Sequence, residues 1–162
     1  MPMTLSGDTG ITFPDSSTVP ATATRSLVRL NTALGNGSTN TAIRRFTNIV
    51  TNQGTDISYT DSATLGASFT INTNGVYAIS FTDSYSAAQN GGISKNSTQL
   101  TTSVVSITAS DLLSAGGSAA ANAWSSTAVV VYLVATDIIR AHTAVTPGVG
   151  TQAATFTIIR VA

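Results

Sequence analysis

The chain has 162 residues, a formal net charge of +0 at pH 7 and only 9% charged residues. That length fits one domain with a sizeable core plus an additional segment. Because Cys is absent, disulfides and thiolate metal sites are excluded. No basic cluster would neutralise a run of phosphates, so we expect no nucleic-acid partner. The apolar runs are far shorter than the roughly 20 residues of a membrane-spanning helix, so we expect no membrane partner.

The composition favours strands over helices. Glu is absent, Lys95 is the only lysine, and Thr, Ser, Val and Ile are abundant. Short strand patterns alternate with turns rich in Gly, Asn, Thr and Asp, which predicts an all-β, antiparallel jelly-roll sandwich of about eight to ten strands. The N-terminus lacks a basic stretch followed by an apolar one, so we expect no signal peptide. A surface with so little charge is typical of a protein covered by neighbours in an assembly; a secreted low-charge β domain is the alternative.

Residues 1–41 are expected to form an extended N-terminal arm that attaches the protein to a capsid or a fibre. Four of its apolar side chains are the candidate attachment points: Ile11, Phe13, Leu27 and Leu30. The stretch around Leu27, Leu30 and Leu34 also fits one short helix. We favour a strand over residues 28–32, which the turn at residues 35–40 would join to residues 43–46 as a hairpin.

Residues 42–162 are expected to form the jelly-roll domain. Predicted strands cover residues 42–50, 57–60, 69–71, 76–82, 93–97, 104–107, 129–134, 138–142 and 156–161. The clearest alternation lies in residues 76–82, where Tyr77, Ile79 and Phe81 share one face. One helical turn is possible at residues 111–113. Residues 116–122 read as a small-residue loop, with Trp124 packed beneath it.

The strand at residues 129–134 is apolar on both faces, so both faces need a cover. Alternation divides its side chains into two sets. Val129, Val131 and Leu133 form one set; Val130, Tyr132 and Val134 form the other. One set is expected to fill the subunit's own core and the other to meet a second subunit. The sequence alone leaves open which set does which.

Several stretches resemble the C1q/TNF-like jelly-roll family: Gly75-Val76-Tyr77 opening an apolar strand, Val131-Tyr132-Leu133, and the closing Phe156-Thr157-Ile158-Ile159. The resemblance implies ten strands and a homotrimer whose axis is lined by apolar strands. It makes residues 129–134, together with Phe156 and Ile158, the candidates for the trimer interface or core. The chain departs from the family in having Thr136-Asp137 where Gly-Asp is usual, and in lacking a collagen repeat.

The stretches at residues 10–15 and 40–46 look most like bacteriophage and prophage structural proteins. The resemblance implies a virion protein, a trimeric decoration or cement protein (a head fibre) on the capsid surface with the major capsid protein as partner. The alternative is a tail-fibre tip or adhesin that recognises host surface glycan through Trp124 and the loops at residues 87–92 and 114–124. A secreted C1q-like bacterial protein is a third hypothesis.

We expect no enzymatic activity, catalytic residue, cofactor or metal. His142 is the only histidine and has no partner at catalytic spacing. Asp56 and Asp61 lie in neighbouring loops and are the one pair for which Ca²⁺ stays open, although no dense acidic loop is present. Arg44 and Arg45 should point to opposite faces of a strand, one pairing within a trimer and one facing a docking partner. The competing interpretation is two solvated arginines.

Overall fold

The computed structural model describes residues 4–6, 10–12, 18–19, 25–118, 120–121, 123–144 and 154–162, with side chains described from Arg25 onward. Near the N-terminus, three short strands pair in the antiparallel order β1-β2-β3. Their bounds are Thr4–Ser6, Gly10–Thr12 and Thr18–Val19. Among the described residues no α-helix occurs, and accordingly none is long and apolar enough to cross a membrane.

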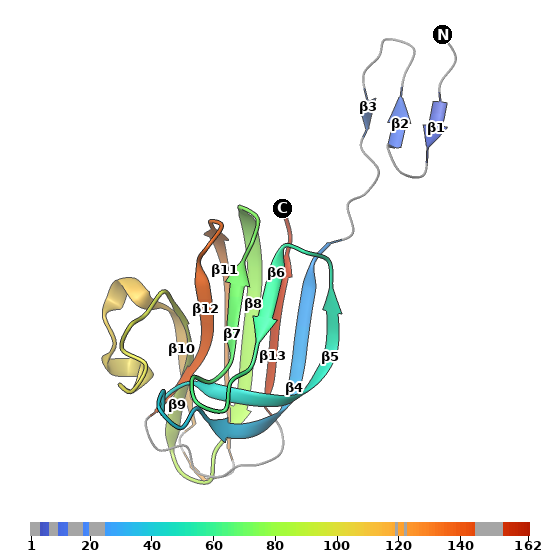
Figure 1. Cartoon of the computed structure of the whole chain (residues 1–162). Coiled ribbons are helices and arrows are strands. Elements are labelled where there is room, and N and C mark those ends of the chain that lie inside the picture. Colours follow the sequence, from blue (N-terminus) through green and yellow to red (C-terminus); the bar gives the residue numbers. More distant parts are fainter. Residues whose placement is uncertain are drawn as a thin grey trace.

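The body of the protein is a sandwich of two five-stranded antiparallel sheets (Figure 1). The first sheet has the order β11-β8-β13-β4-β5, with bounds Trp124–Leu133, Gly75–Ser84, Thr155–Arg160, Leu27–Asn36 and Arg44–Gln53. The second has the order β10-β9-β12-β7-β6, with bounds Leu112–Ser118, Gln89–Lys95, Ile138–Thr143, Ser68–Ile71 and Ile57–Thr60. Ten strands in two sheets confirm the predicted all-β jelly-roll class.

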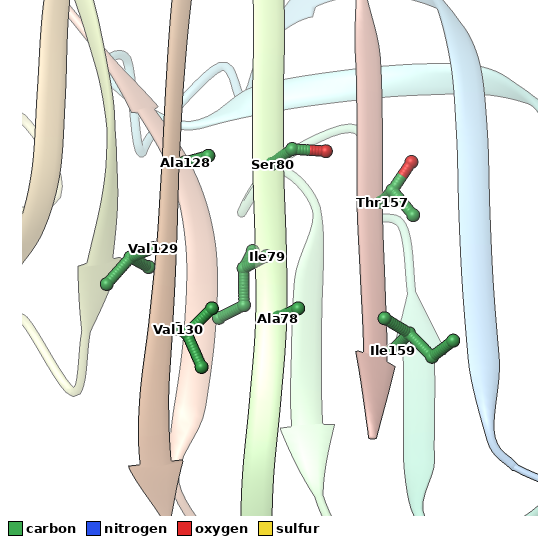
Figure 2. Close-up of a pocket in the computed structure, with 8 residues that line it drawn as sticks. All are labelled: Ala78, Ile79, Ser80, Ala128, Val129, Val130, Thr157 and Ile159. Carbon is green, nitrogen blue, oxygen red and sulfur yellow. The ribbon is translucent and has the colours of Figure 1, made fainter. Parts of the chain in front are cut away.

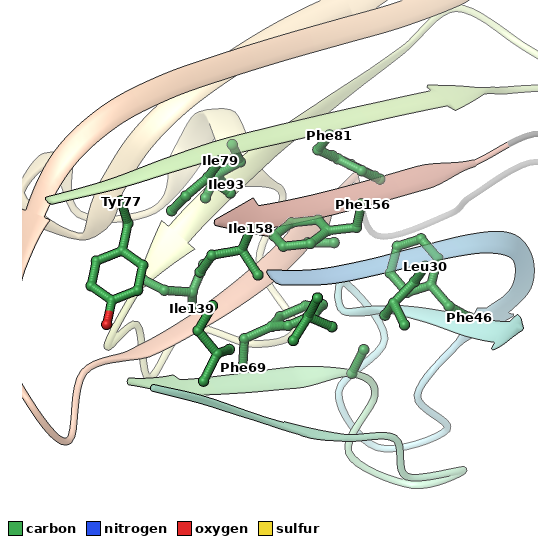
Figure 3. Close-up of a cluster of buried hydrophobic side chains, with 14 of the residues drawn as sticks. Leu30, Phe46, Phe69, Tyr77, Ile79, Phe81, Ile93, Ile139, Phe156 and Ile158 are labelled. Atoms are coloured by element: carbon green, nitrogen blue, oxygen red, sulfur yellow. The ribbon is translucent and has the colours of Figure 1, made fainter. Parts of the chain in front are cut away.

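The core lies between the two sheets and follows the period-2 pattern of the sequence. Along β8, Tyr77, Ile79 and Phe81 are buried while the intervening residues are only partly covered. Phe69 of the second sheet stacks on Phe156 of the first, with ring centroids 4.3 Å apart (Figure 3). Such aromatic pairs bury large apolar areas and hold the two layers in register.

The predicted boundary between arm and body at residue 41 is wrong. Residues 27–36 form β4, which lies between β13 and β5 inside the first sheet. The strand interpretation and its hairpin are confirmed, since Ala33 pairs with Phe46. Leu30 is fully buried in the core, so it is not available to attach the protein to a partner. Propensity alone does not reveal this, because a strand joins a sheet only when its apolar side chains find a core.

Two further arm residues stay predictions. Ile11 belongs to β2, whose side chains are not described, and Phe13 lies outside the described residues. Leu27 begins β4 and is only partly buried, on the outer face of the first sheet opposite Gln53. It is therefore a surface residue of the body rather than part of an arm.

The segment between β9 and β10 also differs from expectation. The strand predicted at residues 104–107 is wrong: Val104–Ser106 is a 3₁₀ turn, and a second covers Ala109–Asp111. Val104 and Ile107 are buried, and Val104–Ser106 lies against β9, so buried side chains hold this segment in place of a ladder of backbone bonds. Strand β10 then begins at Leu112 and runs into the stretch predicted as a loop, where Gly116 pairs with Gly91.

Candidate interaction face

Strand β11 resolves the question of which side chains face outward. Leu133 is fully buried, and Val129 and Val131 pack against the core. On the opposite side, Val130 is 68% and Tyr132 60% exposed. Val134 lies just past the strand and is also exposed. The odd-numbered set therefore fills the sandwich, and the even-numbered set lies on the surface.

The register of the first sheet places further apolar residues beside this exposed set. Val130 pairs with Ala78, Ala78 with Ile159, and Ile159 with Leu27. Tyr132 pairs with Val76 in the next row. We call these six residues the apolar zone: Leu27, Val76, Ala78, Val130, Tyr132 and Ile159.

A shallow hollow of about 370 Å³ lies on this face over β11, β8 and β13. Small side chains, Ala78, Ser80 and Ala128, form part of its lining, with Val130 and Ile159 beside them (Figure 2). Small residues on a sheet surface let another backbone or side chain approach closely. The face therefore combines exposed apolar side chains with a depression that an apolar side chain of another subunit can enter.

The other end of the same face is rich in hydroxyl groups. Ser126 pairs with Thr82, and Thr82 with Thr155; the Oγ1 of Thr82 and the Oγ of Ser126 are 3.1 Å apart. Trp124 pairs with Ser84 in this region and is 57% exposed. We call Trp124, Ser84, Thr82, Ser126 and Thr155 the hydroxyl zone. The prediction that Trp124 packs beneath a loop is wrong, because β11 begins at Trp124 and its parity turns that side chain outward.

Phe156 and Ile158 do not belong to this surface. Both are fully buried in the core, so the core half of their prediction holds and the interface half is wrong. On the outer face of β13 their places are taken by Thr157 and Ile159. Strand parity explains the difference, since residues of one strand reach a partner only from the outer side.

A polar network fixes the point where the chain enters the body. Ser26 Oγ donates to Asp56 Oδ2 at 2.9 Å and accepts from the Asp56 backbone N–H at 2.9 Å. Arg160 donates its backbone N–H to the Ser26 carbonyl at 3.0 Å. The pKa of Asp56 is lowered, first by a hydrogen bond from Thr73 and then by the Ser26 hydroxyl and Arg160. Sequence reasoning missed this network, because nothing local marks residues so far apart in the chain as partners.

The two adjacent arginines are both paired within the subunit. Arg44 points into the core and binds Asp83, and Arg45 lies near the surface with its Nη2 2.7 Å from Asp61 Oδ2. The opposite facing predicted for them is confirmed, but neither the solvated interpretation nor the trimer pairing holds for Arg44. The Asp61 carboxylate raises the pKa of Arg45 by accepting its hydrogen bonds.

In the part of the chain that the structure describes, no three His, Asp or Glu side chains lie together as a group that could hold a metal ion. Asp56 and Asp61 are each bound to a different arginine, Arg160 and Arg45. His142 is fully buried between the Ser94 hydroxyl at 3.1 Å and the Thr102 carbonyl at 2.8 Å. Burial lowers its pKa. Because the carbonyl only accepts, Nε2 of His142 carries the hydrogen, and the ring acts as a structural link.

No protein-family model and no curated protein matches this chain. Solved structures do match. The crystal structure of murine APRIL at pH 8.0 has a TM-score of 0.59 at 11% identity, over 85% of this chain and 100% of that chain. The globular domain of zebrafish complement 1qA protein has a TM-score of 0.58 at 15% identity, over 86% of this chain and 98% of that chain. At such low identity the likeness establishes the fold alone: the chain has the C1q/TNF-like jelly-roll fold.

Proposed function

We propose that this chain is a non-enzymatic structural protein of a bacteriophage particle, a homotrimer that decorates or cements the capsid surface. The observation that carries the trimer is the apolar zone, where Val130 and Tyr132 are mostly exposed in the single subunit. Burying apolar surface contributes about 2.5 kcal/mol per 100 Å², before the entropic cost of association. Three copies related by a closed symmetry would cover all three zones at once.

The attachment part of the proposal rests on the arm. The polar network of Ser26, Asp56 and Arg160 holds the first residues of the body at one end of the sandwich. In a three-fold assembly, three arms would leave from the same end. Three weak attachments to the major capsid protein would then act together and bind far more tightly than one. The resemblance of residues 10–15 and 40–46 to phage structural proteins supports the virion as location.

Two measurements test this proposal. Light scattering coupled to size-exclusion chromatography should give three times the chain mass of 16.4 kDa. A variant lacking residues 1–24 should stay trimeric and lose co-sedimentation with phage capsids that lack the native protein. The deletion stops before Ser26 because that residue belongs to the body. Full occupancy by the truncated trimer would show that the arm is not the anchor, and a monomer at micromolar concentration would refute the interface.

The exposed Trp124 favours a second candidate, an adhesin that binds host glycan. An exposed indole can stack on a sugar ring, and the hydroxyl zone beside it offers hydrogen-bonding groups. Trp124 lies at the first residue of β11. Leu133 is at the other end of the strand, where its partner Gly75 adjoins the C-terminal Ala162. Host polysaccharide should then shift the Trp124 fluorescence in a saturable way. If the fluorescence does not respond while the protein still binds capsids, the adhesin is excluded and the decoration protein is the one remaining candidate.

A further inference from the structure

The outer face of the second sheet carries an arginine in its central strand. Arg140 lies in β12, between β9 and β7. Its neighbours Ile139 and Ala141 are fully buried in the core. Because side chains alternate along a strand, Arg140 points away from the core. It is half-buried beside the segment of residues 97–111, whose Thr102 carbonyl binds His142 on the same strand.

The guanidinium of Arg140 has no acceptor among the residues that the structure describes. Among the described residues, the other buried or half-buried cations, Arg44, Arg45, Lys95 and Arg160, each lie within 4.0 Å of an aspartate. The side chain of Arg140 forms neither an ion pair nor a hydrogen bond with a described residue. Arg25 and Arg29 are exposed. Burial lowers the pKa of Arg140, yet a guanidinium keeps its charge at any ordinary pH. None of its side-chain nitrogens is among the buried polar atoms without a partner, so its N–H donors reach solvent and are open to a ligand.

The groups beside Arg140 bear hydroxyls rather than carboxylates. On one side Arg140 pairs with Ser94. On the other side Ile138 pairs with Thr70 and Ile139 with Phe69, the last pair of that ladder, and one step further along the two strands Ser68 is opposite Arg140. Thr70 in turn pairs with Ser58, and Ser68 with Thr60, on the same outer face. Asp61 is bound to Arg45, and Asp137 to the Asn96 side chain at 2.6 Å.

We propose that Arg140, with the hydroxyls of Ser68 and Thr70, binds the carboxylate of an acidic sugar on the outer face of this sheet. The planar guanidinium matches a carboxylate with two parallel hydrogen bonds. The exposed hydroxyls of Ser58 and Thr60 can exchange hydrogen bonds with the hydroxyls of a sugar ring. This site lies on the sheet opposite to the apolar and hydroxyl zones, so it does not depend on the proposed function.

The test is an NMR titration of the full-length ¹⁵N-labelled protein with sodium glucuronate, against glucose and sodium acetate at matched ionic strength. Glucuronate should shift the amide signals of Ser68, Thr70 and Arg140 in a saturable way. Acetate should bind at least tenfold more weakly, and glucose should produce no saturable shift. Arg140→Gln should weaken glucuronate binding at least tenfold. Arg29→Gln, on the other sheet, should leave it unchanged.

Other outcomes would overturn the proposal. Equal binding of glucose and glucuronate would show that no carboxylate is recognised, and equal binding of acetate would show that the sugar ring is not. Unchanged affinity in Arg140→Gln would remove the arginine from the site. If Arg140→Gln does not fold, Arg140→Lys keeps the charge without the planar fork. Its glucuronate affinity should fall severalfold, and an unchanged affinity would again contradict the assignment.

Discussion

Arg44 Nε lies 2.7 Å from Asp83 Oδ2, and both side chains are only 1% exposed. The pair joins the beginning of β5 to the end of β8, with the Tyr85 ring 6.0 Å from the guanidinium carbon. Burial is the main influence on Asp83 and raises its pKa, while Arg44 opposes that change. Two charges in a dry core stabilise each other only while both are present.

Removing one member of this pair should therefore be strongly destabilising. We expect Asp83→Ala to lower the free energy of unfolding by about 3–5 kcal/mol, because Arg44 stays charged in the core. The double variant Arg44→Met/Asp83→Leu should lose much less. Urea unfolding at one fixed protein concentration measures both, since association changes apparent stability.

The matched control for this pair is Asp61→Ala, which removes the partner of the more exposed Arg45. Pairs near the surface contribute roughly 1 kcal/mol or less. An Asp83→Ala variant that loses no more stability than Asp61→Ala would show that the core pair is not buried as described.

His142 should make the protein less stable in mild acid. Burial lowers its pKa in the folded chain, with a smaller contribution from the charge of Arg140. Below the unfolded value of about 6.5 the unfolded chain therefore binds more protons than the folded one. The free energy of unfolding should fall as the pH drops below about 6.5, by at most about 1.4 kcal/mol per pH unit from this group.

The comparison for His142 is His142→Gln, which removes the titration and keeps a donor for the Thr102 carbonyl. Urea unfolding between pH 7.5 and 5 should show a shallower loss of stability in this variant. Carboxylates contribute equally to both proteins, so the difference in slope belongs to His142. Identical slopes would mean that the folded chain accepts the proton freely.

Thr136 is strained, and glycine should relieve it. Its φ of 80° lies in the left-handed region, which a β-branched side chain rarely adopts. This is the turn where the C1q/TNF-like family usually has Gly-Asp. We expect Thr136→Gly to raise the free energy of unfolding by about 1 kcal/mol. Thr60→Gly, at an exposed position without positive φ, should lower it. A destabilised Thr136→Gly protein would refute the strain.

The apolar zone predicts a variant that folds but does not assemble. Val130→Lys places a charge on a side chain that is exposed in the subunit, so the sandwich should keep its β-sheet circular dichroism. The molar mass by light scattering should fall toward that of one chain. Leu65→Lys, another exposed apolar position outside this sheet, should remain assembled. If Val130→Lys keeps the full molar mass, the subunits must contact one another through a different surface.

Much of the fold follows from local pattern. The alternation through Tyr77, Ile79 and Phe81 predicts β8 and its buried face, and the two-sided apolar character of residues 129–134 predicts a strand needing a second cover. The secondary-structure predictions that rested on weaker patterns were wrong. Residues 104–107 have strand-forming side chains, yet Val104–Ser106 forms a 3₁₀ turn with Val104 buried. Residues 116–118 look like a loop but extend β10, because glycines on β9 permit close pairing.

The sequence by itself determined the strand periodicity of residues 129–134 and the division of their side chains into two sets. The tertiary structure decided which set is buried, because only the position of the second sheet distinguishes one face from the other. It also decided that Trp124 is exposed, that Leu30 is core, and that Arg44 meets Asp83. Those outcomes depend on contacts between residues distant in the chain, whereas a sequence pattern reports only what neighbouring residues favour.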